Sequence, residues 1–318
     1  MKVIQHIENA KGKPLFSFEI LPPLKGQNIQ SIFDSIDPLM EFKPKFIDVT
    51  YHREEYQYKE LPNGLLEKKI VKKRPGTVGI CSAIQNRYNV DAVPHVLCGG
   101  FTREETENLL IDLDFLGINN VVALRGDALK NETYFIPEKE GNAYASELVT
   151  QISKLNQGVY LDDDLKNSAQ TDFCIGVAGY PEKHMEAPSF DSDIHFLKQK
   201  IQNGADYIVT QLFFDNQKYF DFVAKCRKAG ITVPIIPGLK PLATKKQLNQ
   251  IPLRFSVDIP DDLVMAVVKA KDNEAIREIG IEWCVAQSKE LVASGCPVLH
   301  YYSMGKADNI KQIAQAIF

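Results

Sequence analysis

The segment 119–127, which reads NNVVALRGD, most constrains the fold of this chain. Its apolar, β-branched run is typical of a strand inside a sheet that is covered on both faces. Arg125 and Asp127 follow at once, and unpaired charges are costly inside such a sheet. The strand must therefore end at a polar cleft, where Gly126 allows the backbone to turn or to approach a ligand closely.

Seven further apolar runs end at polar residues or at turns, namely 14–23, 45–51, 92–98, 172–178, 206–211, 233–238 and 298–302. Amphipathic segments of helical length lie between them, at 102–117, 192–203, 216–229, 272–293 and 306–318. Alternating strands and helices imply parallel strands with right-handed crossovers. Eight such strands in 318 residues predict one (β/α)8 TIM barrel, a single domain over residues 1–318.

Three local predictions accompany this fold. The segment 77–84 has strand-like composition, but we expect a helix that continues to Tyr88, because Val78, Cys81 and Ile84 share a helical face with it. Thr102 and Glu105 predict a capping box at the start of the helix 102–117. The stretches 130–141 and 158–171 are predicted surface loops, and the basic run 68–74 is predicted to be a solvated helix face.

Composition excludes several classes of protein. Hydrophobic residues at 44% and charged residues at 25% are typical of a folded domain, and a net charge of −4 gives no general attraction for nucleic acid. No apolar run approaches the roughly 20 residues that cross a bilayer, and the N-terminus lacks the apolar stretch of a signal peptide. We therefore expect a cytoplasmic protein that binds small molecules, with neither nucleic acid nor membrane as a partner. The six cysteines show no close pairing, so we expect reduced, buried thiols and no metal site.

The polar residues at the strand ends limit the chemistry of the barrel mouth. The sequence has no glycine-rich dinucleotide motif, no phosphate-binding loop and no serine-hydrolase elbow. The candidate groups are a carboxylic acid, an Arg-Gly-Asp element, histidines, hydroxyls and an amide. This set suits proton transfer and recognition of a large cofactor, and it lacks an evident nucleophile with an adjacent base.

Seven motifs at the predicted strand ends together resemble the methylenetetrahydrofolate reductase family. They are FSFEILPP (16–23), DVTY (48–51), PHVLC (94–98), ALRGD (123–127), GYPEKHMEA (179–187), TQLFFD (210–215) and IIPGLKP (235–241). The resemblance implies a TIM barrel with noncovalent FAD at the C-terminal mouth of the strands. It implies reduction of 5,10-methylenetetrahydrofolate to 5-methyltetrahydrofolate, with NADH or NADPH as electron donor, which feeds methyl groups to methionine synthesis. A homo-oligomer is expected.

The resemblance assigns the two catalytic residues. Glu19 matches the general acid that protonates the folate nitrogen, and burial beside Phe16, Phe18 and Ile20 would raise the pKa of its carboxyl toward neutrality. From the residues alone, a strand-end carboxylate paired with a neighbouring lysine is the favoured interpretation of Glu19, and the FxFExxPP context of the motif reverses that preference. Asp127 matches a carboxylate that faces the folate, stabilises its cationic iminium form and makes the flavin harder to reduce.

The resemblance also assigns cofactor contacts, with Thr50 near the nicotinamide. They are Thr50, Tyr51, His95, Arg125, Gly126, Asp127, Tyr180, His184, Ala187, Asp193 and Lys200. Plainer interpretations remain open from the residues themselves. Arg125 and Asp127 suit a structural ion pair, His95 suits a core histidine bonded to a backbone carbonyl, and Asp193 with Lys200, seven residues apart, suits a solvated helix face.

The substrate contacts that the resemblance implies are Asp127, Gln211, Gln247 and Lys306. Gln211 offers both a donor and an acceptor, as the edge of a pterin or a nicotinamide amide requires. Lys306 stands where many family members carry arginine, so it keeps the charge but loses the bidentate fork. Arg53 replaces a small residue of some relatives, which leaves the nearby adenine or pyrophosphate geometry open.

The sequence is also compatible with two other functions. One is the same folate reduction with electrons from a ferredoxin-like protein in place of a pyridine nucleotide. The other is a barrel that binds folate or flavin without catalysis, which the presence of Glu19, Asp127 and Gln211 disfavours.

Overall fold

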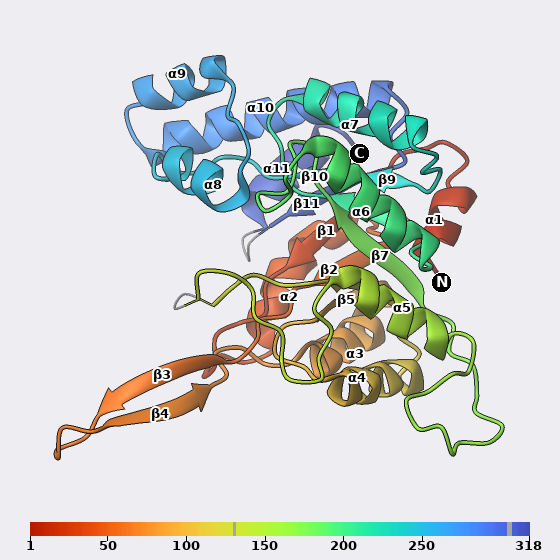
Figure 1. Ribbon diagram of the computed structural model, residues 1–318. Coiled ribbons are helices and arrows are strands. Elements are labelled where there is room, and N and C mark those ends of the chain that lie inside the picture. The colour runs from red at the N-terminus through yellow and green to blue at the C-terminus, as the bar shows by residue number, and fades with distance from the viewer. Residues whose placement is uncertain (130–131, 304–306) are drawn as a thin grey trace.

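The computed structural model describes residues 1–129, 132–303 and 307–318, and its centre is a parallel β-barrel (Figure 1). The sheet runs in the order β10-β11-β1-β2-β5-β6-β7-β8-β9. Its strands are β1 Leu15–Ile20, β2 Phe46–Val49, β5 Asp91–Leu97, β6 Asn120–Leu124, β7 Cys174–Gly179, β8 Tyr207–Thr210, β9 Ile235–Ile236, β10 Gly238–Leu239 and β11 Val298–Tyr302. The predicted TIM barrel is confirmed, and its ring nearly closes.

The ninth strand segment arises because the strand expected at 233–238 is divided at Pro237, which lies between β9 and β10. Gly238 is required just after this break. A Cβ atom there would lie 2.3 Å from the carbonyl oxygen of Thr210 and 2.5 Å from the hydroxyl of Tyr302. The close approach lets the Gly238 amide donate to the Thr210 hydroxyl at 3.0 Å, which joins β10 to the end of β8.

Helices surround the barrel (Figure 1). They are α1 Val3–Asn9, α2 Gln30–Ile36, the 3₁₀ helix η1 Asp37–Phe42, α3 Thr77–Tyr88, α4 Arg103–Phe115, α5 Ala145–Leu155, α6 Phe190–Gln202, α7 Asn216–Lys228, α8 Gln247–Phe255, α9 Asp261–Lys269, α10 Asn273–Ala293 and α11 Asp308–Gln315. The helix expected at 77–88 is confirmed as α3, and the capping box of Thr102 and Glu105 is present. The stretch 158–171 and the described part of 130–141 contain neither helix nor strand, as predicted.

The prediction for the basic run 68–74 is wrong. Lys68 and Lys69 lie in the strand β4 Leu66–Val71, which pairs antiparallel with β3 Glu55–Glu60. Residues two apart share a side of the hairpin, so Leu66, Lys68 and Ile70 lie on one side. In Figure 1 the hairpin projects away from the barrel.

The barrel interior has two halves. The lower half, at the N-terminal ends of the strands, is apolar and consists of Leu15, Phe46, Val93, Val122, Cys174, Tyr207, Val209, Ile236 and Val298, with Val3 of α1 packed against them. The upper half, toward the C-terminal ends, holds buried polar side chains, which are described below. All six cysteines are buried and free, as expected. Within the described ranges, no helix has the length and apolar character that crossing a membrane requires.

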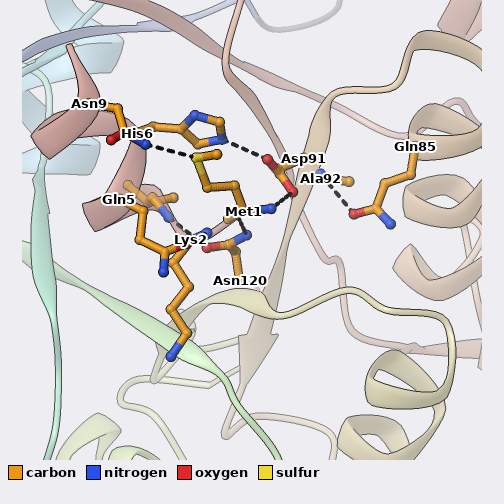
Figure 2. Close-up of polar contacts among 10 residues, drawn as sticks. Met1, Lys2, Gln5, His6, Asn9, Gln85, Asp91, Ala92 and Asn120 are labelled. Carbon is orange, nitrogen blue, oxygen red and sulfur yellow. Dashed lines mark hydrogen bonds and ion pairs between the residues drawn. The ribbon is translucent and has the colours of Figure 1, made fainter.

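Helix α1 closes the lower end of the barrel through polar contacts (Figure 2). The α-amino group of Met1 donates to Asp91 at 2.6 Å, and Nε2 of His6 lies 2.6 Å from the other oxygen of that carboxylate. Asn120 accepts from the Val3 amide at 2.8 Å and donates to the Met1 carbonyl at 2.9 Å. Residues at the start of β5 and β6 therefore hold the helix against the apolar half.

Candidate active site at the mouth of the barrel

The centre of the mouth is Glu19, on the inner face of β1. In the parallel register Glu19 is level with Asp48 on β2 and with Tyr302 on β11. Neighbouring parallel strands direct level residues to the same face, so these three side chains enter the barrel together. The Glu19 side chain is only 11% exposed, and that of Asp48 is 1% exposed.

His95 of β5 joins the two carboxylates. Its Nε2 atom lies 3.5 Å from the Glu19 carboxylate and 3.7 Å from that of Asp48. Burial lowers the pKa of His95, but the hydrogen bond that Asp48 accepts from it and the charges of both carboxylates outweigh burial, so the net direction is upward. An imidazole in contact with two carboxyl groups can hold a proton and exchange it with either.

His300 lies below this group, toward the apolar half. Its Nδ1 atom is 2.9 Å from the hydroxyl of Ser17, and its Nε2 atom is 4.0 Å from Asp48. Burial lowers the pKa of His300, so the neutral imidazole is favoured. Among the described residues, neither Nε2 of His300 nor Oδ1 of Asp48 has a hydrogen-bond partner. Buried polar atoms usually have hydrogen-bond partners.

The electrostatics of the mouth favour a protonated Glu19. The pKa of its carboxyl is raised from 4.5 to about 7, mainly by burial; Asp48 also raises it, and His95 and Lys240 lower it. Lys240 follows β10 directly, and burial lowers the pKa of its amine to about 8. A carboxyl group poised near neutral pH is the property that general-acid catalysis requires.

The rim carries Arg125, Gly126 and Asp127 directly after β6. Arg125 forms two hydrogen bonds with Glu186, at 2.6 and 2.8 Å, and its guanidinium lies 5.0 Å from the ring centre of Phe135. Gly126 has φ of +88°, a conformation that suits glycine. The Asp127 side chain is 86% exposed at the mouth, and Arg254, at 3.8 Å, is its ion-pair partner.

The loop after β7 continues the rim into α6. The rings of Tyr180 and His184 meet edge to face with their centres 4.6 Å apart. The amide of His184 donates to Asp193 at 2.8 Å, and that of Ala187 donates to the His184 carbonyl at 3.0 Å. Lys200 donates to the carbonyl of Ala178 at 2.7 Å, and burial lowers the pKa of this amine to about 8.

The other predicted site residues lie farther along the rim. Thr50 donates to the Ile20 carbonyl at 3.3 Å, and the ring of Tyr51 lies 5.1 Å from that of Phe101. Gln211 follows β8, and its side-chain oxygen accepts from the Leu212 amide at 2.9 Å. The side-chain oxygen of Gln247 accepts from the amides of Ala243 and Thr244, at 2.7 and 3.0 Å, at the start of α8. Lys306 lies outside the described residues, so its predicted contact has no geometry.

These contacts bear on the plainer interpretations of the same residues. Among the described residues, no lysine lies within 4 Å of the Glu19 carboxylate, and its charged neighbour at that distance is His95. His95 contacts carboxylates, and the partner of Arg125 is Glu186 in place of Asp127. Lys200 is bonded to a strand carbonyl, so its side of α6 is not simply solvated.

The motif-based prediction missed Ser17, Asp48, Lys240, His300 and Tyr302. Four of them were detectable, because polar residues alternate with apolar ones in LFSFE, FIDV and VLHYY, which places Ser17, Asp48, His300 and Tyr302 on an inner face. The hydroxyl of Tyr302 donates to the Thr210 carbonyl at 2.6 Å. No sequence period distinguishes Lys240, which follows a strand of two residues.

Comparison with known families identifies the chain at this point. The family model described as methylenetetrahydrofolate reductase matches residues 2–317. The chain belongs to this family. It is 32% identical over 309 residues to "Methylenetetrahydrofolate reductase 1" of Schizosaccharomyces pombe, covering 96% of the chain and 46% of that protein. It is 31% identical over 307 residues to "5,10-methylenetetrahydrofolate reductase" of Escherichia coli K12, and this match covers 96% of the chain and 90% of the Escherichia coli protein. The chain thus spans about half the length of the eukaryotic relative and most of the bacterial one.

Solved structures show the same architecture. An uncharacterized protein from Clostridium thermocellum, described as binding two copies of 5-methyl-5,6,7,8-tetrahydrofolic acid, aligns over 99% of this chain and 98% of its own. The TM-score is 0.57 and the sequence identity 15%. A structure of oxaloacetate acetylhydrolase aligns with a TM-score of 0.51 and 9% sequence identity. The alignment covers 94% of this chain and 79% of that one. At these identities the likeness concerns the fold alone.

Proposed function

We propose that this protein reduces 5,10-methylenetetrahydrofolate to 5-methyltetrahydrofolate in a ping-pong reaction, with electrons from NADH or NADPH passing through bound FAD. Family membership supports the substrate. The single observation that carries the mechanism is the buried Glu19 carboxyl, whose pKa burial raises to about 7 at the centre of the mouth. The barrel of residues 1–318 acts as one catalytic domain in this proposal.

The donor set of the rim fits a flavin dinucleotide. Arg125 and Lys200 supply positive charge for a diphosphate, and Gly126 leaves backbone free to approach the isoalloxazine. Tyr180 and His184 offer an aromatic surface with hydrogen-bonding edges. When bound, FAD would accept a hydride from the nucleotide and pass it on to the folate.

Glu19 holds the proton that the folate half-reaction consumes. Opening the five-membered ring of the substrate places a proton on the leaving nitrogen, and a neutral carboxyl in a shielded mouth can donate it. His95, with Nε2 at 3.5 Å, lies on the route by which Glu19 regains its proton. Hydride transfer from a nicotinamide to flavin needs no such proton, so the two half-reactions depend on Glu19 differently.

Asp127 and Gln211 contact the folate in this proposal. The exposed carboxylate of Asp127 stabilises the cationic iminium before hydride transfer, while its charge disfavours the anionic reduced flavin. Gln211 follows β8 at the rim and presents an amide to the pterin edge. The negative charge of Asp127 therefore acts in opposite directions on the two half-reactions.

Stopped-flow absorbance of the two half-reactions tests the proposal, with Glu19→Gln as the key variant. We expect folate reduction to slow by about 10²–10⁴-fold while flavin reduction by the nucleotide stays nearly unchanged, because only the first reaction needs the proton. Glutamine keeps the size of the side chain. Equal slowing of both half-reactions would show that Glu19 holds the flavin or shapes the site, and normal folate turnover would remove it as the acid.

Asp127→Asn is the contrasting variant in the same assay. Removing the charge should speed flavin reduction and slow folate reduction. A variant that slows both alike would point to a structural role for Asp127. If a ferredoxin-like protein reduces the wild-type flavin and neither NADH nor NADPH does, that protein is the electron donor in place of the nucleotide. If the purified protein is colourless and does not bind FAD, the proposal is wrong.

A further inference from the structure

The hairpin of β3 and β4 has one apolar face and one polar face. Its cross-strand pairs are Tyr56 with Ile70, Tyr58 with Lys68 and Glu60 with Leu66 on one face, and Glu55 with Val71, Gln57 with Lys69 and Lys59 with Glu67 on the other. We name the first the tyrosine face and the second the polar face. Side chains alternate between the faces because the strand period is two.

The tyrosine face is open to solvent along its whole length. Tyr56 is 38% exposed, Tyr58 57%, Leu66 66% and Ile70 62%, and Glu60 and Lys68 on the same face are exposed as well. At on the order of 200 Å² for each large side chain, the four apolar residues expose roughly 450 Å², and Glu60 and Lys68 bring the face to roughly 500–600 Å², the size of the largest patch on a typical monomer. A two-stranded hairpin is marginally stable alone and cannot bury such a face by itself.

We infer that the tyrosine faces of two copies of this chain pack against each other around a two-fold axis, with the hairpins antiparallel. Contact between two such faces would bury about 1,000 Å² or slightly more, close to the lower limit for a specific interface. A two-fold axis makes the contact self-complementary, because each copy presents the same residues. The pairing therefore needs no partner other than the chain itself.

The charges on the tyrosine face select the antiparallel arrangement. An axis that crosses the strands at Tyr58 sets the tip of one hairpin on the base of the other, so Glu60 of each copy faces Tyr56 of its partner. The ammonium of Lys68 lies 3.6 Å from the ring centre of Tyr56, so it already leans toward that position. Each Glu60 then meets a Lys68 across the interface, and Leu66 meets Ile70.

The parallel arrangement lacks this complementarity. An axis along the strands sets tip on tip, so that Glu60 would face Leu66 of the partner. Lys68 would lean toward the base, away from the partner's carboxylate at the tip. A buried carboxylate against leucine without a cation is costly, so this packing is disfavoured.

Sedimentation velocity of the purified holoprotein over a concentration series tests the inference. We expect reversible association that Glu60→Lys and Lys68→Glu each weaken by about tenfold or more, because each variant places like charges together twice. The double variant Glu60→Lys/Lys68→Glu should restore association, since it exchanges the two charges. Tyr58→Ser, at the two-fold axis, should abolish the association.

The polar face supplies the matched control. Gln57→Glu and Lys69→Glu lie on the same two strands but point away from the interface, so both should associate like the wild type. Melting temperature and flavin content should stay unchanged in all variants, because the hairpin lies outside the barrel (Figure 1). The inference would be overturned if the wild type does not associate. It would also be overturned if the wild type associates but no substitution on the tyrosine face changes the molecular mass in solution. Disruption by Tyr58→Ser without rescue by the double variant would overturn the antiparallel arrangement.

Discussion

The two halves of the barrel interior come from the same strands but have opposite chemistry. On β1, Leu15 belongs to the lower half, whereas Ser17 and Glu19 belong to the upper half. On β2, Phe46 lies two residues before Asp48. A pleat with a period of two lets one face of one strand contribute first to a core and then to a site. The apolar half stabilises the ring, and the polar half uses that stability to hold buried charges.

The difference appears in the partners that each half provides. The lower residues are packed against one another and against α1. In the upper half, the Nε2 atoms of His95 and His300 lie 3.7 and 4.0 Å from the Asp48 carboxylate, and none of the three side chains is more than 12% exposed. Buried ionisable groups held close together are costly to a fold, so their concentration in the upper half supports a functional role there. Substitutions that act on one half alone can test this division.

The largest expected effect is on stability, from Phe46→Ala in the lower half. Phe46 is fully buried, and truncation of a buried phenylalanine costs about 3–5 kcal/mol. Urea unfolding should show the loss, while each folded molecule keeps most of its activity. His300 stacks on Phe46 with ring centres 6.4 Å apart, so a modest effect on the upper half is expected. A loss of activity at unchanged stability would contradict the division between the halves.

The second-largest expected effect is the loss of folding stability that ionised Glu19 causes in the upper half. Its folded-state pKa of about 7 exceeds its ordinary value of 4.5, so the stability contributed by the neutral form is fully present below pH 4.5 and is lost as pH rises through 7. Glu19→Gln removes this dependence. The variant should gain up to about 3 kcal/mol over the wild type between pH 4.5 and pH 8. Urea unfolding at both pH values measures it, and equal pH dependence of the two proteins would show that Glu19 titrates normally.

The fold was more predictable from sequence than the arrangement within the site. The apolar runs and their polar ends predicted the barrel, since burial on both faces leaves few alternatives for such strands. The hairpin was missed because its second strand, 66–71, does not alternate polar and apolar residues: Lys68 and Lys69 are adjacent, and so are Ile70 and Val71. The motifs identified Glu19 but not its neighbours Asp48 and His300, whose contact depends on the register of three strands. Register is a tertiary property that no local pattern contains.

A smaller effect is expected where α1 closes the lower half. Burial alone would raise the pKa of Asp91, but hydrogen bonds from His6 and from the α-amino group of Met1 hold it below its ordinary value. Asp91→Asn removes the carboxylate that the α-amino group of Met1 and the His6 imidazole contact, and should cost about 1–2 kcal/mol, since the side chain is 21% exposed. Hydrogen exchange of the α1 amides should increase, while the half-reactions stay unchanged. Unaltered exchange would show that apolar packing alone holds α1.

The smallest expected effect is a shift in the pH profile of folate reduction, and it separates the two charges nearest Glu19. Asp48 raises the pKa of the Glu19 carboxyl, and Lys240 lowers it. Asp48→Asn should therefore move the alkaline limb of the folate half-reaction to lower pH, and Lys240→Met should move it to higher pH, each by about one pH unit or less.

Stopped-flow rates between pH 6 and pH 9, roughly the range around neutrality in which this carboxyl titrates, measure both shifts. Flavin reduction by the nucleotide serves as the control in the same samples, because it does not use the Glu19 proton. Asp48→Asn also removes a charge that raises the pKa of His95. If His95 then returns the proton to Glu19 more slowly, the maximal rate of folate reduction falls, but the direction of the pH shift stays the same. Opposite shifts from the two variants would identify the limb as the titration of Glu19. Shifts of the same sign would assign it to another group and leave the upper half without its proposed acid.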